Sequence, residues 1–371
     1  MKRVLLIAPY KYLPYETGGQ KLIGQFTEEL GKQCQLFVIS TRSNDASKAQ
    51  HYELIKCLNP SFFRYLDISL VKRIIDVIKI EKIDFIIWEH PYYAWLAWII
   101  KKLTGIKTIF HTHNIEFQRF KSMGKWWWPI LKLYEKFCFT LADKICFITD
   151  ADAGFAIDNW KISNEKCYSL PFGVEIEKYP LDKKEAATTI REKYKIASQD
   201  RLLLFNGALD YAPNSEALEV ILNKINPLLI NSGIAYKIII CGKGLSPALN
   251  ELKEYKEKNI VYAGFVPDIE TYFKAADILL NPVQSGGGIK TKMIEAIAFG
   301  ASVVATKTAA TGLNPSICNE KLMIVNDSDW ESFAKTVIEN NTYNNNTPIE
   351  FYNEYNWAKI VQRFLNNNLI K

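Results

Sequence analysis

The glycines at 286–288 precede a run, 289–298, whose apolar residues have the spacing of one helix face. A glycine-rich loop before a helix lets a ligand approach bare amide groups at the positive end of the helix dipole, where phosphate is the usual ligand. Lys290 and Lys292 fall in the first turn of the predicted helix, where the dipole disfavours cations unless an anion offsets them. The stretch therefore predicts a phosphate site, with a flexible turn before a solvated helix as the alternative.

Three of the four histidines, His90, His111 and His113, come directly after or at the end of predicted strands. His111 and His113 share one face if the strand continues, and such a pair can act as acid, base or hydrogen-bond donor. The pair could also bind zinc, although no third ligand of matching spacing is visible. Each histidine could instead be a structural residue of the core. Their shared position at strand ends favours a functional role.

Two further glycine motifs also follow predicted strands. Gly18 and Gly19 precede a helix and form a second turn that is compatible with phosphate. The stretch CGKGLSP at 241–247 resembles G-x-G-x-x-G, but Pro247 replaces the third glycine, and the next strand offers no acid for a ribose. We therefore expect this stretch to be an ordinary strand-to-helix turn beside the ligand.

Two weaker sequence signals are compatible with a metal site and with a membrane contact. Asp150 and Asp152 have a spacing that could hold a divalent metal, but helix N-capping explains Asp150 more simply, and DSDW at 327–330 is also expected to cap a helix. The tryptophans at 126–128 lie beside lysines and could enter a lipid headgroup layer. Core packing or contact with a partner is the favoured interpretation of the tryptophans.

Short apolar runs alternate with helical segments along nearly the whole chain, and runs that are apolar on both faces are typical of buried parallel strands. Strands are expected at 4–9, 35–40, 84–89, 107–112 and 144–149, then, after a linker at 169–186, at 202–209, 236–242, 260–265, 277–283 and 301–306. Helices are expected at 20–32, 66–82, 95–103, 216–229, 248–257, 269–275 and 289–298. The fold class is therefore α/β, with two doubly wound parallel-sheet domains.

The two series set the expected domain bounds. We expect a first domain at 1–175, a second at 176–350, and a C-terminal helix within 351–371 that returns toward the first domain. A ligand should bind where the carboxyl ends of the strands of both domains face each other across a cleft.

Composition narrows the function further. The 371 residues carry a net charge of +6, with 48% hydrophobic and 23% charged residues, and no basic block that would indicate nucleic acid. Seven scattered cysteines without CxxC spacing indicate reduced thiols. The start, MKRVLLIAPY, lacks the features of a signal peptide, and no apolar stretch approaches the roughly 20 residues of a membrane span. We expect a soluble, cytoplasmic protein, with a mild basic excess that could favour phosphorylated ligands or an anionic membrane face.

Along nearly its whole length the chain resembles the family-four retaining glycosyltransferases of the GT-B fold, whose two domains are Rossmann-like. The resemblance rests on the GG before the first helix, HTHNIE at 111–116, PFGVE at 171–175, FNGALDYAPNSEAL at 205–218, IIICGKG at 238–244, VYAGFV at 261–266 and GGGIKTKMIEAIAFGASVVAT at 286–306. In that family the first half binds the acceptor and the second half binds a nucleotide-diphosphate sugar.

The resemblance implies a role for each matching residue. His113, or else His111, would be catalytic and face the sugar near its reacting carbon, and Glu295 would bond the ribose hydroxyls. The implied donor-binding residues are Gly18, Gly19, Gly207, Gly242, Gly286, Gly287, Gly288, Ile289, Lys290, Lys292 and Glu295. No metal ligand and no cofactor is implied, because fixed amides and a lysine can stabilise the departing diphosphate without a metal.

The chain also departs from the family pattern. The first of two glutamates that the family usually has is Gly287 here, and the usual arginine and lysine are replaced by residues 208–210, Ala-Leu-Asp. Lys290 and Lys292 point about 200° apart on an ideal helix, so both cannot face one ligand equally. Lys292 could pair with Glu295. We prefer Lys290 as the phosphate ligand, because first-turn side chains lean back toward the N-terminus.

The leading hypothesis is a retaining hexosyltransferase that acts on a glycan or lipid-linked acceptor in bacterial surface polysaccharide synthesis, as a peripheral protein at the inner face of the membrane. One alternative is a sugar-nucleotide epimerase of the same fold. Another is a catalytically weak partner subunit that binds nucleotide sugar, which the missing glutamate at Gly287 suggests.

Overall fold

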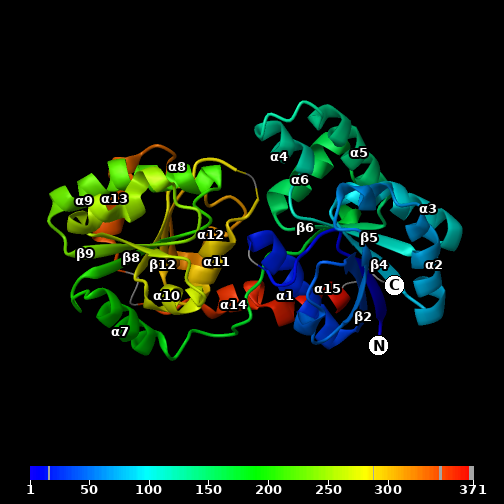
Figure 1. Ribbon diagram of the computed structural model, residues 1–371, viewed down its shortest axis with the longest axis horizontal. Helices are drawn as coiled ribbons and strands as arrows, with labels where there is room; N and C mark the ends of the chain where they lie inside the picture. Colours follow the sequence, from blue (N-terminus) through cyan, green and yellow to red (C-terminus); the bar gives the residue numbers. More distant parts are fainter. Residues whose placement is uncertain (16, 287, 342–344, 367–371) are drawn as a thin grey trace. The chain divides into compact units, whose positions relative to one another are not determined.

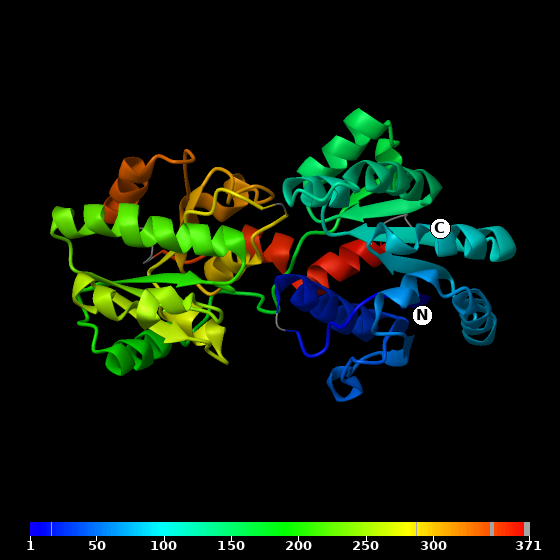
Figure 2. The same cartoon turned by 45° about the horizontal axis from the view of Figure 1, so that its top comes forward.

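The computed structural model describes residues 1–15, 17–286, 288–341 and 345–366, and the chain divides into two compact units. Unit 1 comprises Met1–Gly173 and Trp357–Lys371, and unit 2 comprises Val174–Asn356. Gly287 and the last residues of unit 1 lie outside the described residues. Each unit is an α/β layer structure in which helices cover both faces of a sheet (Figures 1 and 2). No helix in the described part of the chain has the length and apolar character needed to cross a bilayer.

Unit 1 is built on one parallel sheet. Its elements are β1 (Arg3–Ile7), α1 (Gly18–Gln33), β2 (Gln35–Thr41), β3 (Glu53–Leu58), α2 (Ser69–Glu81), β4 (Phe85–Glu89), α3 (Ala94–Thr104), β5 (Lys107–Thr112), α4 (Glu116–Ser122), α5 (Trp128–Leu141), β6 (Lys144–Phe147), α6 (Asp150–Trp160), β7 (Cys167–Ser169) and α15 (Trp357–Asn366). Within the described residues this sheet has the order β3-β2-β1-β4-β5-β6-β7. The order reverses between β1 and β4, and ligands of open α/β sheets bind at such a switch point, beyond the carboxyl ends of the strands.

The two faces of this sheet are covered by different helices. Helices α2, α3 and α5 pack in a row over one face, where Leu5, Trp88 and Phe110 belong to a single apolar cluster. On the other face α1 packs beside α15, far away in sequence (Figure 1). The Nε1–H group of Trp357 in α15 donates to Gln25 at 3.1 Å, and a Cβ at Gly173 would lie 2.5 Å from the Trp357 ring. The glycine of the PFGVE motif therefore permits close packing of α15.

Unit 2 repeats the architecture. Its elements are α7 (Lys183–Tyr194), β8 (Arg201–Asn206), α8 (Ala212–Val220), a π-helical turn (Ile221–Ile225), α9 (Asn226–Ser232), β9 (Tyr236–Cys241), β10 (Ile260–Gly264), α10 (Ile269–Ala275), β11 (Ile278–Asn281), α11 (Thr291–Ala298), β12 (Ser302–Thr306), α12 (Pro315–Cys318), β13 (Leu322–Val325), α13 (Trp330–Glu339) and α14 (Ile349–Tyr355). The described part of this sheet has the order β10-β9-β8-β11-β12-β13, so its switch point lies between β8 and β11. Helices α8, α9 and α13 lie on one face, and α7 and α10 on the other (Figure 1).

The doubly wound α/β prediction is confirmed, because both sheets are parallel with helices between successive strands. The predicted helix at 248–257 is wrong in part. Asn250, Glu251 and Leu252 have left-handed φ angles of 42°, 52° and 57°, which break this stretch into two short 3₁₀ turns.

Candidate active site

Unit 1 brings a polar cluster to its switch point. Strands β4 and β5 pair so that Glu89 lies opposite His111. The Glu89 carboxylate accepts hydrogen bonds from His111 Nδ1 at 3.0 Å and from His113 Nε2 at 2.8 Å. All three side chains are buried, and the His111 ring packs against Phe26 of α1 with centroids 5.2 Å apart. His111 therefore lies under α1, whereas His113 lies just beyond the end of β5.

The protonation of this cluster follows from its charges. Burial opposes ionisation of Glu89, but the charges and hydrogen bonds of the two histidines outweigh it and hold the Glu89 pKa well below its usual range. An ionised carboxylate can only accept hydrogen bonds, so each histidine must donate through the nitrogen that faces it. Burial, helped by the charge of His90, lowers the pKa of His113 to about 3 despite its bond to Glu89. His113 is therefore neutral at pH 7 and retains Nδ1 as its acceptor atom.

His90 has the most unusual backbone of the cluster. Its φ of 66° and ψ of 163° lie in a region that is normally occupied by glycine, and such conformations collect at functional sites. Tyr10, which follows β1, hydrogen bonds to Nε2 of His90, and the His90 and His113 rings lie 4.1 Å apart. Nδ1 of His90 lies 3.5 Å from the buried carboxylate of Glu116, at the start of α4. Tyr10, Glu89 and Glu116 belong to this cluster but were not predicted from the sequence, because their partners are distant in the chain.

The same cluster contains a set of atoms that could hold a metal. One ligand atom each of Glu89, His111 and His113 lies within 4.8 Å of the others, so Glu89 is a third candidate ligand that no spacing in the sequence makes visible. Glu89 escaped notice because sheet pairing, not sequence spacing, places it beside the histidines. A metal at this position would have to replace both Glu89–histidine hydrogen bonds.

The glycine pair of unit 1 begins a capped helix. Gly18 is the first residue of α1, and the N-cap Thr17 forms a capping box with Gln20. A Cβ at Gly19 would meet no other atom within 4 Å. Packing therefore gives no reason for glycine at position 19, and the space beside it is open.

The long glycine loop of unit 2 lies at the second switch point, between β11 and α11. Gly286 and Gly288 have positive φ angles of 81° and 73°, which favour glycine. A Cβ at Gly286 would lie 3.1 Å from the Tyr211 hydroxyl and from Pro213. The remaining loop glycine, Gly287, lies outside the described residues. The loop is thus shaped by its backbone and by contact with the residues that follow β8.

Lys290 is placed differently from the prediction. Helix α11 begins at Thr291, so Ile289 and Lys290 precede the helix, and Lys290 is its N-cap. Because Lys290 precedes the first turn of α11, the usual lean of first-turn side chains toward the N-terminus does not apply to it. Its Nζ instead turns back and donates to the carbonyl groups of Gly286 at 2.8 Å and Gly288 at 3.2 Å. Burial lowers the pKa of Lys290 to about 8.

Lys292 joins the loop to strand β8. Its Nζ donates to the carbonyl oxygen of Asn206 at 3.0 Å and to the side chain of Asn214 at 3.1 Å. The ammonium group also lies over the Phe205 ring, 4.5 Å from its centroid. Burial and the charge of Lys290 lower the Lys292 pKa to about 7. These contacts make Lys292 a link between α11 and β8, and Glu295, one turn further on, is buried.

Gly207 and Gly242 have a packing reason to be glycine. Their φ angles are 154° and 151°, and a Cβ at Gly242 would lie 1.8 Å from the Gly207 carbonyl oxygen. A Cβ at Gly207 would meet the Asn214 side chain at 2.6 Å. The turns that follow β8 and β9 are therefore in backbone contact, which explains both glycines without a ligand.

The structure also describes the residues of the weaker sequence signals, namely the two expected helix caps and the tryptophans at 126–128. The N-cap of α6 is Thr149, whose hydroxyl accepts from the Asp152 amide at 3.1 Å, so the proposed cap at Asp150 was wrong by one residue. Asp329 caps α13 and accepts from the Ser332 amide, as predicted for DSDW. Of the tryptophans, Trp126 is 82% exposed, whereas Trp127 and Trp128 are half-buried against Phe120 and Phe117.

Two family models match the two halves of the chain. Residues 17–178 match the model described as Glycosyltransferase Family 4, and residues 200–340 match the model described as Glycosyl transferases group 1. The chain is a family-four-like, group 1 glycosyltransferase. The matched ranges include the glycine motifs at 18–19, 241–247 and 286–288 and the three histidines of the cluster, but not strand β1 or Tyr10.

Curated relatives of this glycosyltransferase are distant. An uncharacterised glycosyltransferase of Methanocaldococcus jannaschii is 23% identical over 397 aligned positions, which cover 97% of this chain and 96% of the relative. An uncharacterised 44.6 kDa protein in the cps region of Klebsiella pneumoniae is 28% identical over 142 residues. That second alignment spans 37% of this chain and only 36% of the relative.

Solved structures share the fold of this glycosyltransferase at low identity. Sucrose-phosphate synthase of Thermosynechococcus elongatus is 14% identical, with a TM-score of 0.72 over 98% of this chain and 97% of its own. The Anabaena protein HepE in complex with UDP-glucose is 13% identical, with a TM-score of 0.68 over 98% of each chain. These likenesses confirm the GT-B fold.

Proposed function

We propose that this glycosyltransferase moves a sugar from a nucleotide-diphosphate sugar to a hydroxyl group of a glycan or lipid-linked acceptor, with retention of configuration. The observation that carries the proposal is the glycine loop at the unit 2 switch point, with Lys290 at the N-cap of α11 and Glu295 one turn into the helix. An ammonium group and helix amides at one point suit a diphosphate. The binding of UDP-glucose by HepE, a protein of the same fold, supports the same type of donor.

The chemistry follows from this placement. Cleavage of the sugar–phosphate bond leaves negative charge on the diphosphate, which the loop amides and Lys290 stabilise. The acceptor hydroxyl attacks from the side that the diphosphate vacates, and the leaving phosphate takes its proton. Neutral His113, held by Glu89, accepts a hydrogen bond from a sugar hydroxyl through Nδ1. In this scheme Glu295 binds the ribose hydroxyls, and no metal is required.

Thermal unfolding with a panel of uridine, guanosine, adenosine and thymidine diphosphates tests this proposal. A ligand at about 100 times its dissociation constant adds roughly 2.7 kcal/mol to the stability of the state that it binds. One base should raise the melting temperature by a few degrees, and the shift should survive a chelator. Glu295→Ala should weaken binding by about 1.5–3 kcal/mol, as expected for a hydrogen bond to a charged group. A shift that appears only with magnesium or manganese, and is lost in Glu89→Gln, would contradict metal independence.

One feature of this chain supports an alternative, a catalytically weak partner subunit that binds nucleotide sugar. Asp210 stands where the family usually has a cation, and a Cβ at Gly244 would lie 2.7 Å from the Asp210 carboxyl carbon. A carboxylate among these loops disfavours a diphosphate. Release of free sugar from the preferred donor by the purified protein would identify an enzyme, and nucleotide binding without any turnover would identify the subunit.

We also propose contact with an anionic membrane, at the inner face of the membrane of a bacterial cell that builds surface polysaccharide. The support is an exposed apolar stripe on and before α5, formed by Trp126, Ile130, Leu133 and Phe137 with exposed fractions of 82%, 65%, 71% and 42%. Lys125, Lys132 and Lys136 are exposed beside it, and Glu135, the one acidic residue between 117 and 142, is buried. A basic face with an apolar stripe suits an anionic lipid surface.

Vesicle sedimentation tests the membrane contact. Trp126→Ser with Leu133→Ser should reduce binding to phosphatidylcholine vesicles that contain phosphatidylglycerol. The matched control is Phe62→Ser with Phe63→Ser, which removes apolar groups that are 69% and 72% exposed on a different segment of unit 1. Equal loss in both variants, or no binding by the parent protein, would contradict this contact.

A further inference from the structure

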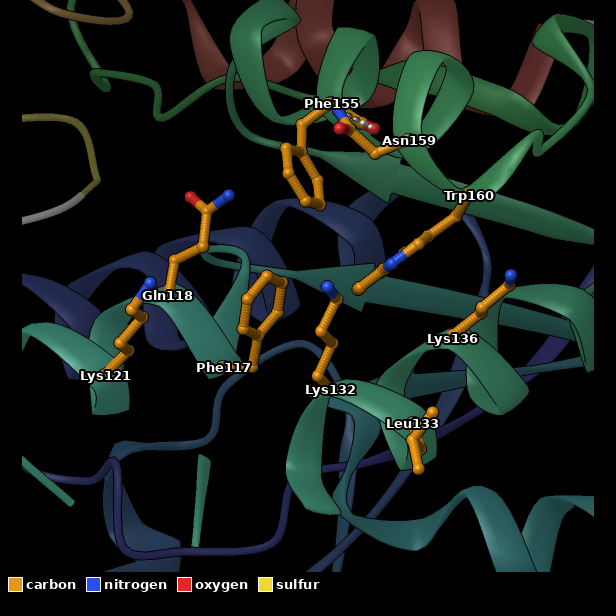
Figure 3. Close-up of a pocket in the computed structure, with 9 residues that line it drawn as sticks. All are labelled: Phe117, Gln118, Lys121, Lys132, Leu133, Lys136, Phe155, Asn159 and Trp160. Carbon is orange, nitrogen blue, oxygen red and sulfur yellow. Dashed lines mark hydrogen bonds between the residues drawn. The ribbon is translucent and has the colours of Figure 1, made fainter. Parts of the chain in front are cut away.

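A cavity of about 620 Å³ opens in unit 1 between α4, α5 and α6 (Figure 3). Its lining residues are Phe117, Gln118, Lys121, Lys132, Leu133, Lys136, Phe155, Asn159 and Trp160. The volume lies within the range of small-molecule sites in proteins. Helix α4 follows the carboxyl end of β5 and α6 follows that of β6, so the cavity borders the edge of the sheet where ligands of such folds bind.

The cavity is strongly basic. Three of its lining residues are lysines, and none is acidic. Among the residues that the structure describes, no carboxylate lies within ion-pair distance of Lys121, Lys132 or Lys136. Lys121 lies over the Trp128 ring at 4.9 Å and Lys132 over the Phe117 ring at 5.5 Å, so aromatic faces hold two of the ammonium groups in place. This excess of positive charge in a concave site favours an anionic ligand.

Aromatic rings form the inner wall of the cavity. The Phe117 ring centroid lies 5.8 Å from that of Phe155 and 5.6 Å from that of Trp160, and Phe117 and Trp160 are each only 5% exposed. Figure 3 shows the Lys132 side chain between Phe117 and Trp160 and the Gln118 side chain on the other side of Phe117. The Asn159 amide lies beside Phe155, to whose carbonyl group it donates at 3.1 Å. The negatively polarised faces of such rings attract the polarised C–H groups of a sugar, and amides bond its hydroxyls.

We propose that this cavity binds an anionic sugar, a pyranose that carries a phosphate or a carboxylate, and that this sugar belongs to the acceptor. The lysines bind the anionic group, the aromatic wall contacts the ring, and the amides bond the hydroxyls. The inference rests on the proposed function only in naming the occupant as acceptor; the binding chemistry stands on the cavity itself.

A chain of contacts connects the cavity to the histidine cluster. Phe117 directly follows Glu116, whose carboxylate accepts from the Tyr92 hydroxyl at 2.7 Å and faces His90. The amides of Glu116 and Phe117 both donate to the buried carboxylate of Glu135, at 2.8 and 3.1 Å. The start of α4, which carries Phe117 of the cavity wall, is thus bonded to the histidine cluster on one side and to α5 on the other.

Ligand-observed NMR titration of the full chain tests this proposal. The probes are glucose 6-phosphate, glucose and inorganic phosphate, each with and without the nucleoside diphosphate that stabilises the protein most. We expect glucose 6-phosphate to bind at least tenfold more tightly than either other probe, with the nucleotide bound or absent. Lys132→Gln with Lys136→Gln should weaken it tenfold or more. The matched control, Lys79→Gln with Lys102→Gln, removes the same charge from exposed lysines that do not line the cavity.

Each possible source of the anion gives a different outcome. Loss of glucose 6-phosphate binding when nucleotide is added would assign the sugar to the donor site, and would overturn the proposal. Equal binding of inorganic phosphate would leave a phosphate site without sugar recognition. Vesicles that contain phosphatidylglycerol, bound by the parent and control but not by the cavity variant, would assign the lysines to lipid headgroups if glucose 6-phosphate does not bind. Failure of every nucleotide to bind, with glucose 6-phosphate still bound, would refute the proposed function and keep the anionic-sugar site.

Discussion

In unit 1 the buried carboxylate of Glu89 accepts hydrogen bonds from two imidazoles, whereas in unit 2 the ammonium group of Lys292 donates to a backbone carbonyl and an amide oxygen. The pKa of each group is lowered, but the two shifts have opposite effects on the charge of the group. For Glu89 the shift favours the charged form, because its partners outweigh burial. For Lys292 it favours the neutral form, because burial is not offset by any carboxylate that the structure describes. Unit 1 therefore stabilises its buried carboxylate with its own hydrogen-bond donors, whereas we expect the buried lysine of unit 2 to gain a counter-charge from the proposed diphosphate ligand.

The largest expected effect comes from removing the shared hydrogen-bond acceptor of unit 1. Glu89→Ala leaves two buried imidazole N–H groups without their acceptor, and each unsatisfied buried donor costs about 1–3 kcal/mol of unfolding free energy. Urea unfolding measures this loss. The exposed Glu177→Ala serves as the control and should change stability by less than about 0.5 kcal/mol. A Glu89 variant as stable as its parent would show that the cluster does not depend on its carboxylate.

The second effect separates the two histidines. His113→Ala should lower kcat about 100-fold, in the range for a group that assists the transition state, and change nucleotide affinity only a few-fold. His111→Ala should act mainly on stability, because its ring is 1% exposed and packs on Phe26. Steady-state kinetics and thermal unfolding of both variants measure the difference. The reverse pattern would exchange the two roles.

The acid side of the stability profile tests the His113 environment. The folded-state pKa of about 3 lies below the ordinary value of 6.5, so the unfolded chain binds more protons between these two values. Stability should therefore fall as the pH falls from about 6.5 to 3. His113→Gln, which still offers Glu89 an N–H group, should flatten this fall. An equally steep profile in the variant would place the responsible group elsewhere.

The third effect concerns the lysines of unit 2. Their pKa values of about 8 for Lys290 and about 7 for Lys292 mean that diphosphate binding at neutral pH should take up protons. Affinity should then fall as the pH rises from 7 to 9, by up to about tenfold per unit for each proton taken up. Calorimetry in two buffers with different ionisation enthalpies measures the uptake directly. Lys290→Met and Lys292→Met should each reduce it, and equal heats in both buffers would show that neither lysine responds to the ligand.

The difference between the two units also explains which parts of the structure could be predicted from the sequence. Long apolar runs such as 84–89 and 301–306 identify buried strands, because their pattern is local. Strands β3, β7 and β13 escaped notice, since Glu53–Leu58 is interrupted by polar residues and the other two are only three and four residues long. The lysines and glycines of the unit 2 loop were predicted as a site because their motif is contiguous. Glu89 was not, because only strand pairing brings it to histidines more than 20 residues away.

The smallest expected effect lies at Gly19, which separates a ligand role from a packing role. A Cβ there meets no atom within 4 Å, so Gly19→Ala should keep or slightly raise stability, because alanine suits the first turn of α1 better than glycine. Diphosphate affinity should nevertheless fall several-fold, because the methyl group occupies the open space in which we place the ligand. Gly154→Ala in α6 is the matched control: it is equally unobstructed and helical, and no ligand is proposed there. Calorimetric titration of both variants with the diphosphate measures this difference in affinity. Unchanged affinity in Gly19→Ala would show that Gly19 takes no part in diphosphate binding.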